Sequence, residues 1–118
     1  MIDIQTLRQH ALSLPEATEE PHFEKSSFRV RKKIFVTFDA KHNRVCLKFS
    51  EADQDVFSLA GKQSIYPVPN KWGKQGWTFV ELETVRDDLF RDALITAYCE
   101  VAPKKLAEQV RPNDPKQL

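Results

Sequence analysis

Basic and aromatic side chains are the residues of this chain whose types and spacing suggest chemistry, and that chemistry is the binding of anions. Residues 25–48 contain eight Lys or Arg residues and a single acid, Asp39. Residues 62–78 add three lysines and no acid, whereas residues 79–102 contain six acids and two arginines. The formal net charge of +1 therefore conceals separate basic and acidic segments. Because local fields decide what a surface attracts, the basic segments predict a surface for phosphate or another anion.

The elements that would position these residues follow from hydrophobic periodicity. A helix is expected to begin after Asp3 and to end at Pro15. The acidic segment Glu16–Glu24 is interpreted as a connector. Alternation of apolar and polar residues then predicts three antiparallel strands over residues 26–31, 34–39 and 44–49. Tight turns are expected at Lys32-Lys33 and at residues 40–43.

The second half of the chain predicts one more hairpin and three more helices. Ser50 is expected to cap a short helix that Gly61 terminates, and prolines place the strand over residues 65–68 at a sheet edge. The later elements are a glycine-bearing loop at 71–77, a strand at 77–85 and helices at 86–101 and 104–110. The plan is α+β, with an antiparallel sheet covered on one face by the terminal helices. We expect one domain over residues 1–118, with a frayed tail from about residue 112.

The uncovered face of that sheet is the first candidate site. If the apolar strand residues face the helices, the opposite face combines cations with the rings of Phe35, Trp77 and Phe79. Its cations are Arg29, Arg31, Arg44 and Lys48, and the hairpin tips add Lys32, Lys33, Lys71 and Lys74. Cations bind phosphates, and an exposed ring such as Trp72 or Trp77 can stack on bases. The alternative is that the cations only solubilise the sheet and the rings pack under a loop or in a dimer interface.

A second candidate combines Lys104 and Lys105 with the loop that carries Trp72 and Trp77. Lysines in the first turn of a helix lie beside free N–H groups, which predicts a site for a small anion. Two glycines in the loop would let the backbone approach a ligand. The alternatives are two solvated lysines and a hairpin that both indoles anchor to the body.

Catalytic and metal-binding patterns are absent from the sequence, which favours a binding protein over an enzyme. The three histidines are scattered, and no HExxH, Walker or GxSxG pattern occurs. Cys46 and Cys99 have no metal or redox spacing, so we predict no metal and no cofactor. With neither a long apolar run nor a signal peptide, the expected location is the cytoplasm, without membrane contact. A monomer or a weak homodimer is expected.

Several short motifs together resemble the MmcQ/YjbR family of small bacterial proteins. They are Phe28-Arg29-Val30, Lys32-Lys33-Ile34-Phe35, Lys71-Trp72-Gly73 with Gly76-Trp77, and the run from Ala97-Tyr98 to Ala102-Pro103-Lys104-Lys105-Leu106. The opening Leu12–Pro15 segment also fits, so the resemblance spans roughly residues 3–110. It implies a fold of the frataxin/CyaY type with two β-hairpin wings, and a role in DNA binding. The iron binding of frataxins does not transfer, since their first helix is acidic and this one holds Arg8 and His10.

The leading hypothesis from the sequence is a nucleic-acid-binding protein of low sequence specificity that uses the sheet face and the two wings. DNA is the expected partner. The first alternative is a protein or uncharacterised enzyme that binds a small anionic ligand near Lys104, Lys105 and the tryptophan loop. The second is a protein-interaction domain with Trp77 and Phe79 as apolar anchors. The small net charge counts against nucleic acid, because dedicated binders are usually more basic.

Overall fold

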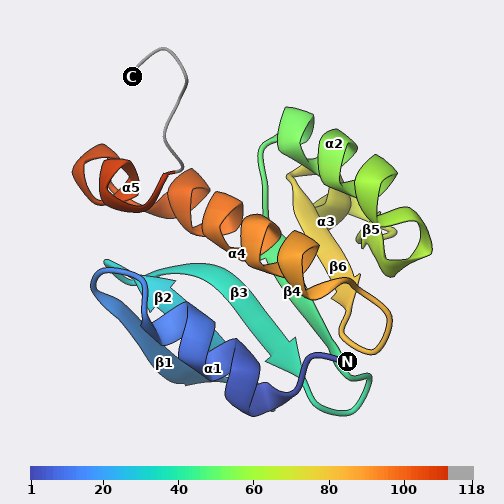
Figure 1. Cartoon of the computed structure of the whole chain (residues 1–118), viewed down its shortest axis with the longest axis horizontal. Coiled ribbons are helices and arrows are strands. Elements are labelled where there is room, and N and C mark those ends of the chain that lie inside the picture. The colour runs from blue at the N-terminus through green and yellow to red at the C-terminus, as the bar shows by residue number, and fades with distance from the viewer. Residues whose placement is uncertain (112–118) are drawn as a thin grey trace.

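The computed structural model describes residues 1–111 as a six-stranded antiparallel sheet with helices packed on it (Figure 1). The strands are β1 (Ala17–His22), β2 (Lys25–Val30), β3 (Lys33–Asp39), β4 (Arg44–Lys48), β5 (Ile65–Pro67) and β6 (Trp77–Glu81). The α helices are α1 (Ile4–Leu12), α2 (Glu51–Gly61), α3 (Lys71–Lys74), α4 (Asp87–Val101) and α5 (Lys104–Val110), and a 3-10 turn covers Lys62–Ser64. The strand order is β1-β2-β3-β4-β6-β5. The predicted α+β class is confirmed. The predicted tail lies outside the described residues.

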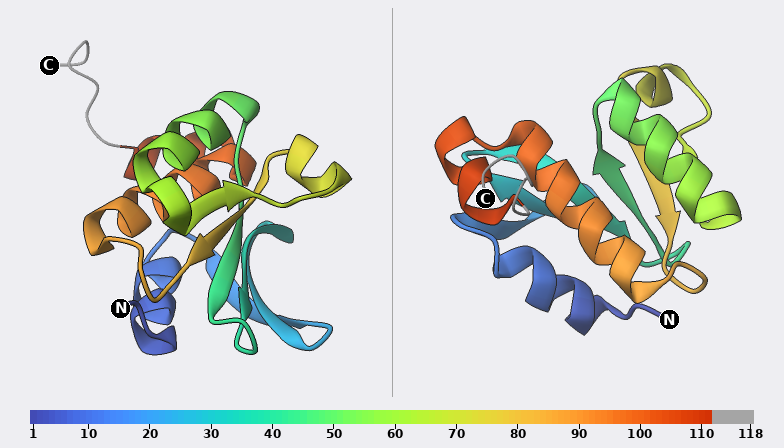
Figure 2. Two further views of the ribbon diagram at one scale, coloured as in Figure 1. Left: turned by 90° about the vertical axis from the view of Figure 1, so that its right-hand side faces the viewer. Right: turned by 45° about the horizontal axis from the view of Figure 1, so that its top comes forward.

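The longer helices lie on one face of the sheet and leave the other face open (Figure 2). Helix α4 packs on β3 and β4, α2 packs beside β5, and α5 rests on α4. The core between helices and sheet is mainly apolar, and its largest fully buried side chains include Tyr98, Phe28, Phe35, Phe49 and Phe90. None of the helices within residues 1–111 is long and apolar enough to cross a membrane.

Local signals in the sequence account for the helix ends. The Asp3 carboxylate accepts from the Thr6 N–H at 2.8 Å, and the Ser50 hydroxyl accepts from the Asp53 N–H at 3.1 Å. These caps satisfy N–H groups that the helices leave free. Gly61 was expected to end α2 in a left-handed conformation, but this is wrong: Gly61 is helical, and Lys62 has the positive φ of 54°.

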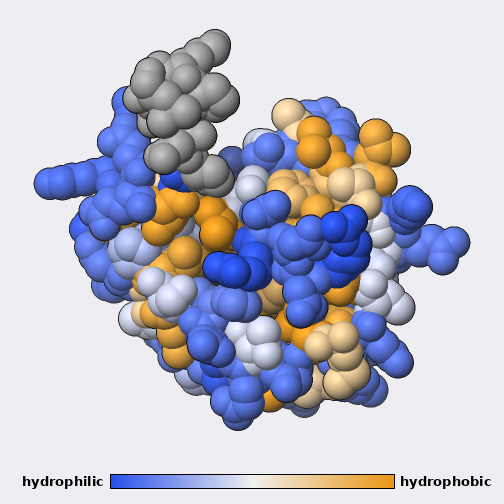
Figure 3. Space-filling model, viewed as in Figure 1, coloured by the Kyte–Doolittle hydropathy of each residue, from blue (hydrophilic) through white to orange (hydrophobic). Residues whose placement is uncertain are grey.

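Helix α2 is less apolar on its buried side than the sequence suggests. Of its large apolar residues only Phe57 packs against the core, where its ring stacks on Phe49 at a centroid distance of 5.0 Å. Val56 and Leu59 are exposed instead. Hydrophobic atoms accordingly gather over α2 in the space-filling view (Figure 3).

The interpretation of residues 16–24 as a connector is wrong, because residues 17–22 form the edge strand β1. This strand pairs with β2 from Ala17 opposite Val30 to His22 opposite Lys25. Pro21 is tolerated because one side of an edge strand needs no ladder hydrogen bonds. The acids of β1 therefore lie beside the basic strand β2 instead of being separated from it in a loop.

A β-bulge in β3 changes which of its side chains faces the helices. Phe28 pairs with Val36 and Arg29 pairs with Ile34, so Phe35 is the extra residue of the bulge. The Phe35 ring is fully buried and meets the Tyr98 ring edge to face at 5.4 Å. The prediction that Phe35 faces outward and Ile34 inward is therefore wrong, and Ile34 takes the place on the open face.

The turns around the open face also differ from expectation. The β2–β3 turn consists of Arg31 and Lys32, both with positive φ, and Lys33 already belongs to β3. Two positive φ values are typical of a type I′ hairpin turn, here formed without Gly or Asn. The predicted loop over residues 71–77 contains the single-turn helix α3 before β6 begins.

Candidate ligand-binding groove on the open sheet face

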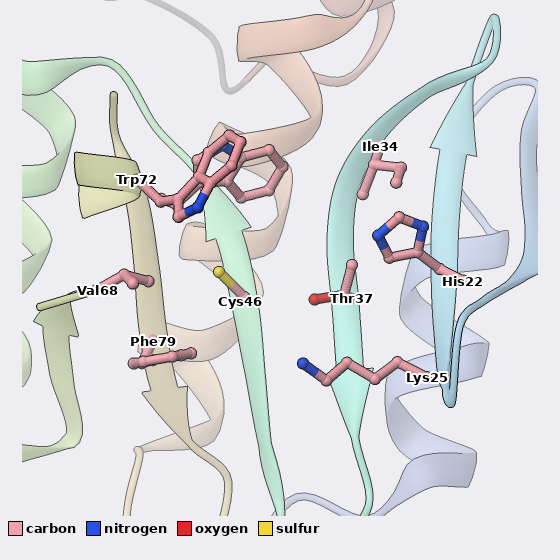
Figure 4. A pocket seen from close by; sticks show the side chains of 9 residues that line it. His22, Lys25, Ile34, Thr37, Cys46, Val68, Trp72 and Phe79 are labelled. Carbon is pink, nitrogen blue, oxygen red and sulfur yellow. The ribbon is translucent and has the colours of Figure 1, made fainter. Parts of the chain in front are cut away.

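The open face of the sheet is hollowed into a groove of about 460 Å³. This volume is in the range of about 300–1,000 Å³ that small-molecule sites occupy. The groove extends from β1 and β2 across the middle strands to the segment between β5 and β6 (Figure 4). The side chains that line it are His22, Lys25, Ile34, Thr37, Cys46, Val68, Trp72, Trp77 and Phe79. Most of these are apolar or aromatic.

One end of the groove is aromatic. Trp72 extends from α3 over the floor toward Cys46, and Phe79 lies on the strand below it (Figure 4). Trp77 joins them from the start of β6. The Trp72 side chain remains half exposed, at 49%. A flat apolar molecule placed on this end would contact several ring faces or edges, which is the arrangement that stabilises stacked aromatic groups.

Helix α3 is fixed in place by close backbone approaches and by Gln54 of α2. The buried Gln54 amide nitrogen donates to the Gly73 oxygen at 2.9 Å, the Trp77 oxygen at 3.2 Å and the Thr78 hydroxyl at 3.1 Å. The Asn70 side chain caps the turn by accepting from the Trp72 N–H at 2.8 Å. A Cβ atom at Gly73 would overlap the Val68 carbonyl oxygen. The position of the Trp72 ring therefore depends on both a glycine and a buried hydrogen-bonding clamp.

The other end of the groove is polar. The Lys25 side chain extends across the sheet toward Thr37, and His22 lies beside Ile34 (Figure 4). Cys46 lies between the two ends. Burial raises the pKa of the Cys46 thiol to about 11, so this thiol stays protonated near neutral pH and is a poor nucleophile. The groove thus offers hydrogen-bond donors but no activated nucleophile at Cys46.

Two of the predicted phosphate-binding arginines are bound by the protein itself. The Arg31 guanidinium donates two hydrogen bonds to the Glu16 carboxylate, at 2.6 and 3.1 Å. Arg29 donates to the Ser27 hydroxyl at 2.9 Å and to the Pro21 oxygen at 3.3 Å. The hydrogen bond from Arg31 lowers the pKa of the Glu16 carboxyl. Two of these three partners, Glu16 and Pro21, belong to the segment that was interpreted as a connector, and Ser27 lies on β2.

The other two predicted cations of the sheet face are also engaged. The Arg44 guanidinium lies 3.8 Å from the centre of the Phe79 ring, and it reaches the Tyr66 hydroxyl at 3.5 Å. The Lys48 ammonium donates to the Gln75 oxygen and, at 3.3 Å, to the Phe49 oxygen. Lys48 thus holds the end of α3 against β4. Arg44 and Lys48 have structural contacts that a phosphate would have to displace.

The remaining predicted cations are exposed but separated. Lys32 and Lys33 lie at the β2–β3 turn, and Lys71 and Lys74 lie on α3. No ion pair involves any of these four within residues 1–111. Lys104 and Lys105 are exposed on α5, which packs on α4, and neither lines the groove. The structure therefore does not bring these two lysines together with the tryptophan loop.

Several groove residues escaped the sequence analysis: His22, Lys25, Ile34, Thr37 and Val68. His22 lies on the strand that was interpreted as a connector, and Ile34 reaches the open face only through the bulge. A proline in an acidic segment is compatible with an edge strand as well as with a connector, so Pro21 did not distinguish the two. Within residues 1–111 no group of three or more His, Cys, Asp or Glu side chains is arranged to hold a metal ion.

Comparison with known proteins places the fold but not the chemistry. The family model described as YjbR matches residues 12–100. Among solved structures, the crystal structure of Deinococcus radiodurans protein DR2400, with the family-model domain DUF419, superposes with a TM-score of 0.76 at 24% identity. The match covers 92% of this chain and 88% of that chain. No curated protein matches the sequence.

Proposed function

The chain belongs to the YjbR family, and we propose that it is a binding protein for a flat, mainly apolar small molecule, which lies in the groove of the open sheet face. The observation that carries this proposal is the convergence of Trp72, Trp77 and Phe79 on one end of a 460 Å³ groove. Large apolar rings left on a concave surface are costly to hydrate, and a ligand that covers them gains that free energy. These three rings are not part of the fully buried core, which lies between the sheet and the helices.

The tight anchoring of the groove supports ligand binding over a simple solvated sheet. Helix α3 has only one turn, and contacts made by Gln54, Gly73 and Lys48 hold it in place. A preorganised ring loses less conformational entropy on binding than a mobile one. The protein-interaction alternative would use the same rings, but Phe79 lies under Arg44 and against Tyr66, which leaves it a poor protruding anchor.

A bicyclic probe tests the proposal. Naphthalene-2-carboxamide is expected to quench the fluorescence of the chain's two tryptophans, because both line the groove. Replacement of Trp72 by alanine should weaken the affinity about tenfold, as expected for the loss of one stacking partner. Because the variant has lost one of the two tryptophan fluorophores, isothermal titration calorimetry is used to measure its affinity for the probe.

The matched control is Leu59→Ala, which removes an exposed apolar side chain from α2. This variant should bind the probe as the unaltered protein does. Failure of naphthalene-2-carboxamide to bind, or equal weakening by Trp72→Ala and Leu59→Ala, would overturn the proposal.

Nucleic-acid binding is a second candidate function, but its proposed binding surface is α3 and not the sheet face. The observation in its favour is that the half-exposed Trp72 ring lies 5.6 Å from the Lys71 ammonium, with the exposed Lys74 on the same turn. A base could stack on the ring while the lysines contact phosphates. Arg29, Arg31, Arg44 and Lys48 would contribute little, since each already has partners in the protein.

This second candidate predicts binding that depends on salt and on α3. Fluorescence anisotropy with a labelled single strand should show micromolar affinity at low salt and a linear fall of log K with log salt. The double reversal Lys71→Glu plus Lys74→Glu should weaken binding more than tenfold. Lys104→Glu plus Lys105→Glu makes the same change of charge on α5 and serves as the control. Salt-independent binding, or an equal loss in both variants, would count against nucleic acid.

A further inference from the structure

We propose that the ligand of the groove carries a single carboxylate, which the Lys25 ammonium and the Thr37 hydroxyl bind while the aromatic rings hold its flat body. This inference rests on the proposed function and names its ligand class. The groove has two chemically different ends, one aromatic and one with hydrogen-bond donors. A molecule that satisfies both ends must be amphipathic.

The Lys25 ammonium is the charged group that distinguishes the polar end. Within residues 1–111 it forms no hydrogen bond and no ion pair, although its side chain extends over the sheet toward Thr37 (Figure 4). Its charge nevertheless reaches the floor of the groove: burial raises the pKa of Cys46, and the Lys25 ammonium partly opposes that shift. Lys25 is an exposed residue, and its ammonium, which has no counter-ion beside a largely apolar groove, is available to an anion.

The Asp39 carboxylate, whose pKa the Lys25 charge affects, already has other partners. Burial would raise the pKa of Asp39, but the hydrogen bond with His42 lowers it, and the Lys25 charge adds to that lowering. Asp39 lies 2.7 Å from His42 Nδ1 and accepts from the Lys41 N–H at 3.1 Å. Glu20, on the neighbouring strand, lies 4.0 Å from Arg29. Asp39 and Glu20 therefore have partners other than Lys25.

The groups at this end also indicate what kind of anion fits. The Thr37 hydroxyl, which forms no hydrogen bond within the described residues, and the Lys25 ammonium can each donate to one carboxylate oxygen. The arginines that would suit a phosphate dianion are occupied: Arg29 by Ser27 and Pro21, and Arg31 by Glu16. Among the residues that line the groove, the Lys25 ammonium and the Thr37 hydroxyl together match a monoanion. The apolar remainder of the groove matches an aromatic acid.

The test compares naphthalene-2-carboxylate with naphthalene-2-carboxamide, which has the same shape and no charge. The carboxylate is expected to bind about tenfold more tightly, the gain of one charge-assisted contact. Lys25→Met should remove this preference by weakening the binding of the carboxylate more than that of the carboxamide. Lys105→Met removes the same charge on the opposite side of the sheet and should keep the preference. Thermal melts confirm that both variants fold.

The outcomes separate this inference from the proposed function. Equal affinity for the two probes, or a preference that survives Lys25→Met, overturns the carboxylate and leaves the binding of a flat apolar molecule standing. A preference lost in Lys105→Met but kept in Lys25→Met would place the anion site on α5 and also overturns it. No binding of either probe overturns both proposals.

Discussion

Replacement of Phe35 by alanine is expected to lower the free energy of unfolding by about 3–5 kcal/mol, the usual cost of deleting a buried aromatic ring. The ring is fully buried and packs edge to face against Tyr98 of α4. Its removal would leave a cavity where the sheet meets the longest helix. Urea denaturation followed by circular dichroism measures the change as a shift of the midpoint.

The neighbouring variant Ile34→Ala serves as a control for the bulge. Ile34 lies on the open face and is only partly buried, so its loss should cost less than about half as much. If the bulge were absent, the two costs would be reversed. A Phe35→Ala protein as stable as the unaltered chain would therefore contradict the register described for β2 and β3.

The second large effect is expected at Gly76, where alanine should cost about 2–4 kcal/mol and displace α3. Gly76 has a φ of 102°, which L residues rarely adopt, and an added Cβ would overlap the Phe49 carbonyl oxygen. Two backbone hydrogen bonds anchor the same residue, from the Phe49 N–H to its oxygen and from its own N–H to the Gly73 oxygen, each at 3.0 Å. Denaturation measures the stability, and tryptophan fluorescence reports the displacement.

Gln75→Ala is the matched control, because Gln75 is the exposed neighbour and its backbone has an ordinary negative φ. This variant should change stability by less than about 0.5 kcal/mol. Since Trp72 and Trp77 flank Gly76 in sequence, a shift of the emission maximum is expected only in Gly76→Ala. An unchanged spectrum and midpoint in that variant would mean that the turn accommodates a side chain.

The sequence predicts those parts of the fold that depend on local patterns. The caps at Asp3 and Ser50, the alternation of Val45, Leu47 and Phe49, and the helix before Val101 are all confirmed. In each case a short window contains the whole cause: a capping oxygen, a period of two, or a period of 3.6. The edge position of β5 is confirmed for the same reason, since Pro67 lacks the N–H that a central strand needs.

The rest depends on contacts between distant segments. A prediction from alternation assigns every second residue to the same face of a strand. One bulge residue therefore exchanges Ile34 and Phe35 between the faces, and the sequence pattern does not show where the bulge lies. Strand β1 has no fully buried residue, so no apolar pattern in the sequence predicts it. Its pairing with β2 in turn decides that Arg31 binds Glu16, 15 residues away. The groove could therefore be anticipated at Cys46, Trp77 and Phe79, but not at its polar end.

The acidic edge strand has an evolutionary consequence. The charge of the open face depends on side chains of β1, a strand that contributes no fully buried residue to the core. A mutation at Glu16, directly before this strand, would thus leave packing intact while releasing Arg31 from its ion pair. A mutation at Glu20 would remove the carboxylate that lies 4.0 Å from Arg29, although Arg29 would keep its hydrogen bonds to Ser27 and Pro21. The open face could thus become strongly cationic through a few substitutions that leave the stability of the fold unchanged. Selection can therefore change what this surface attracts without rebuilding the domain that supports it.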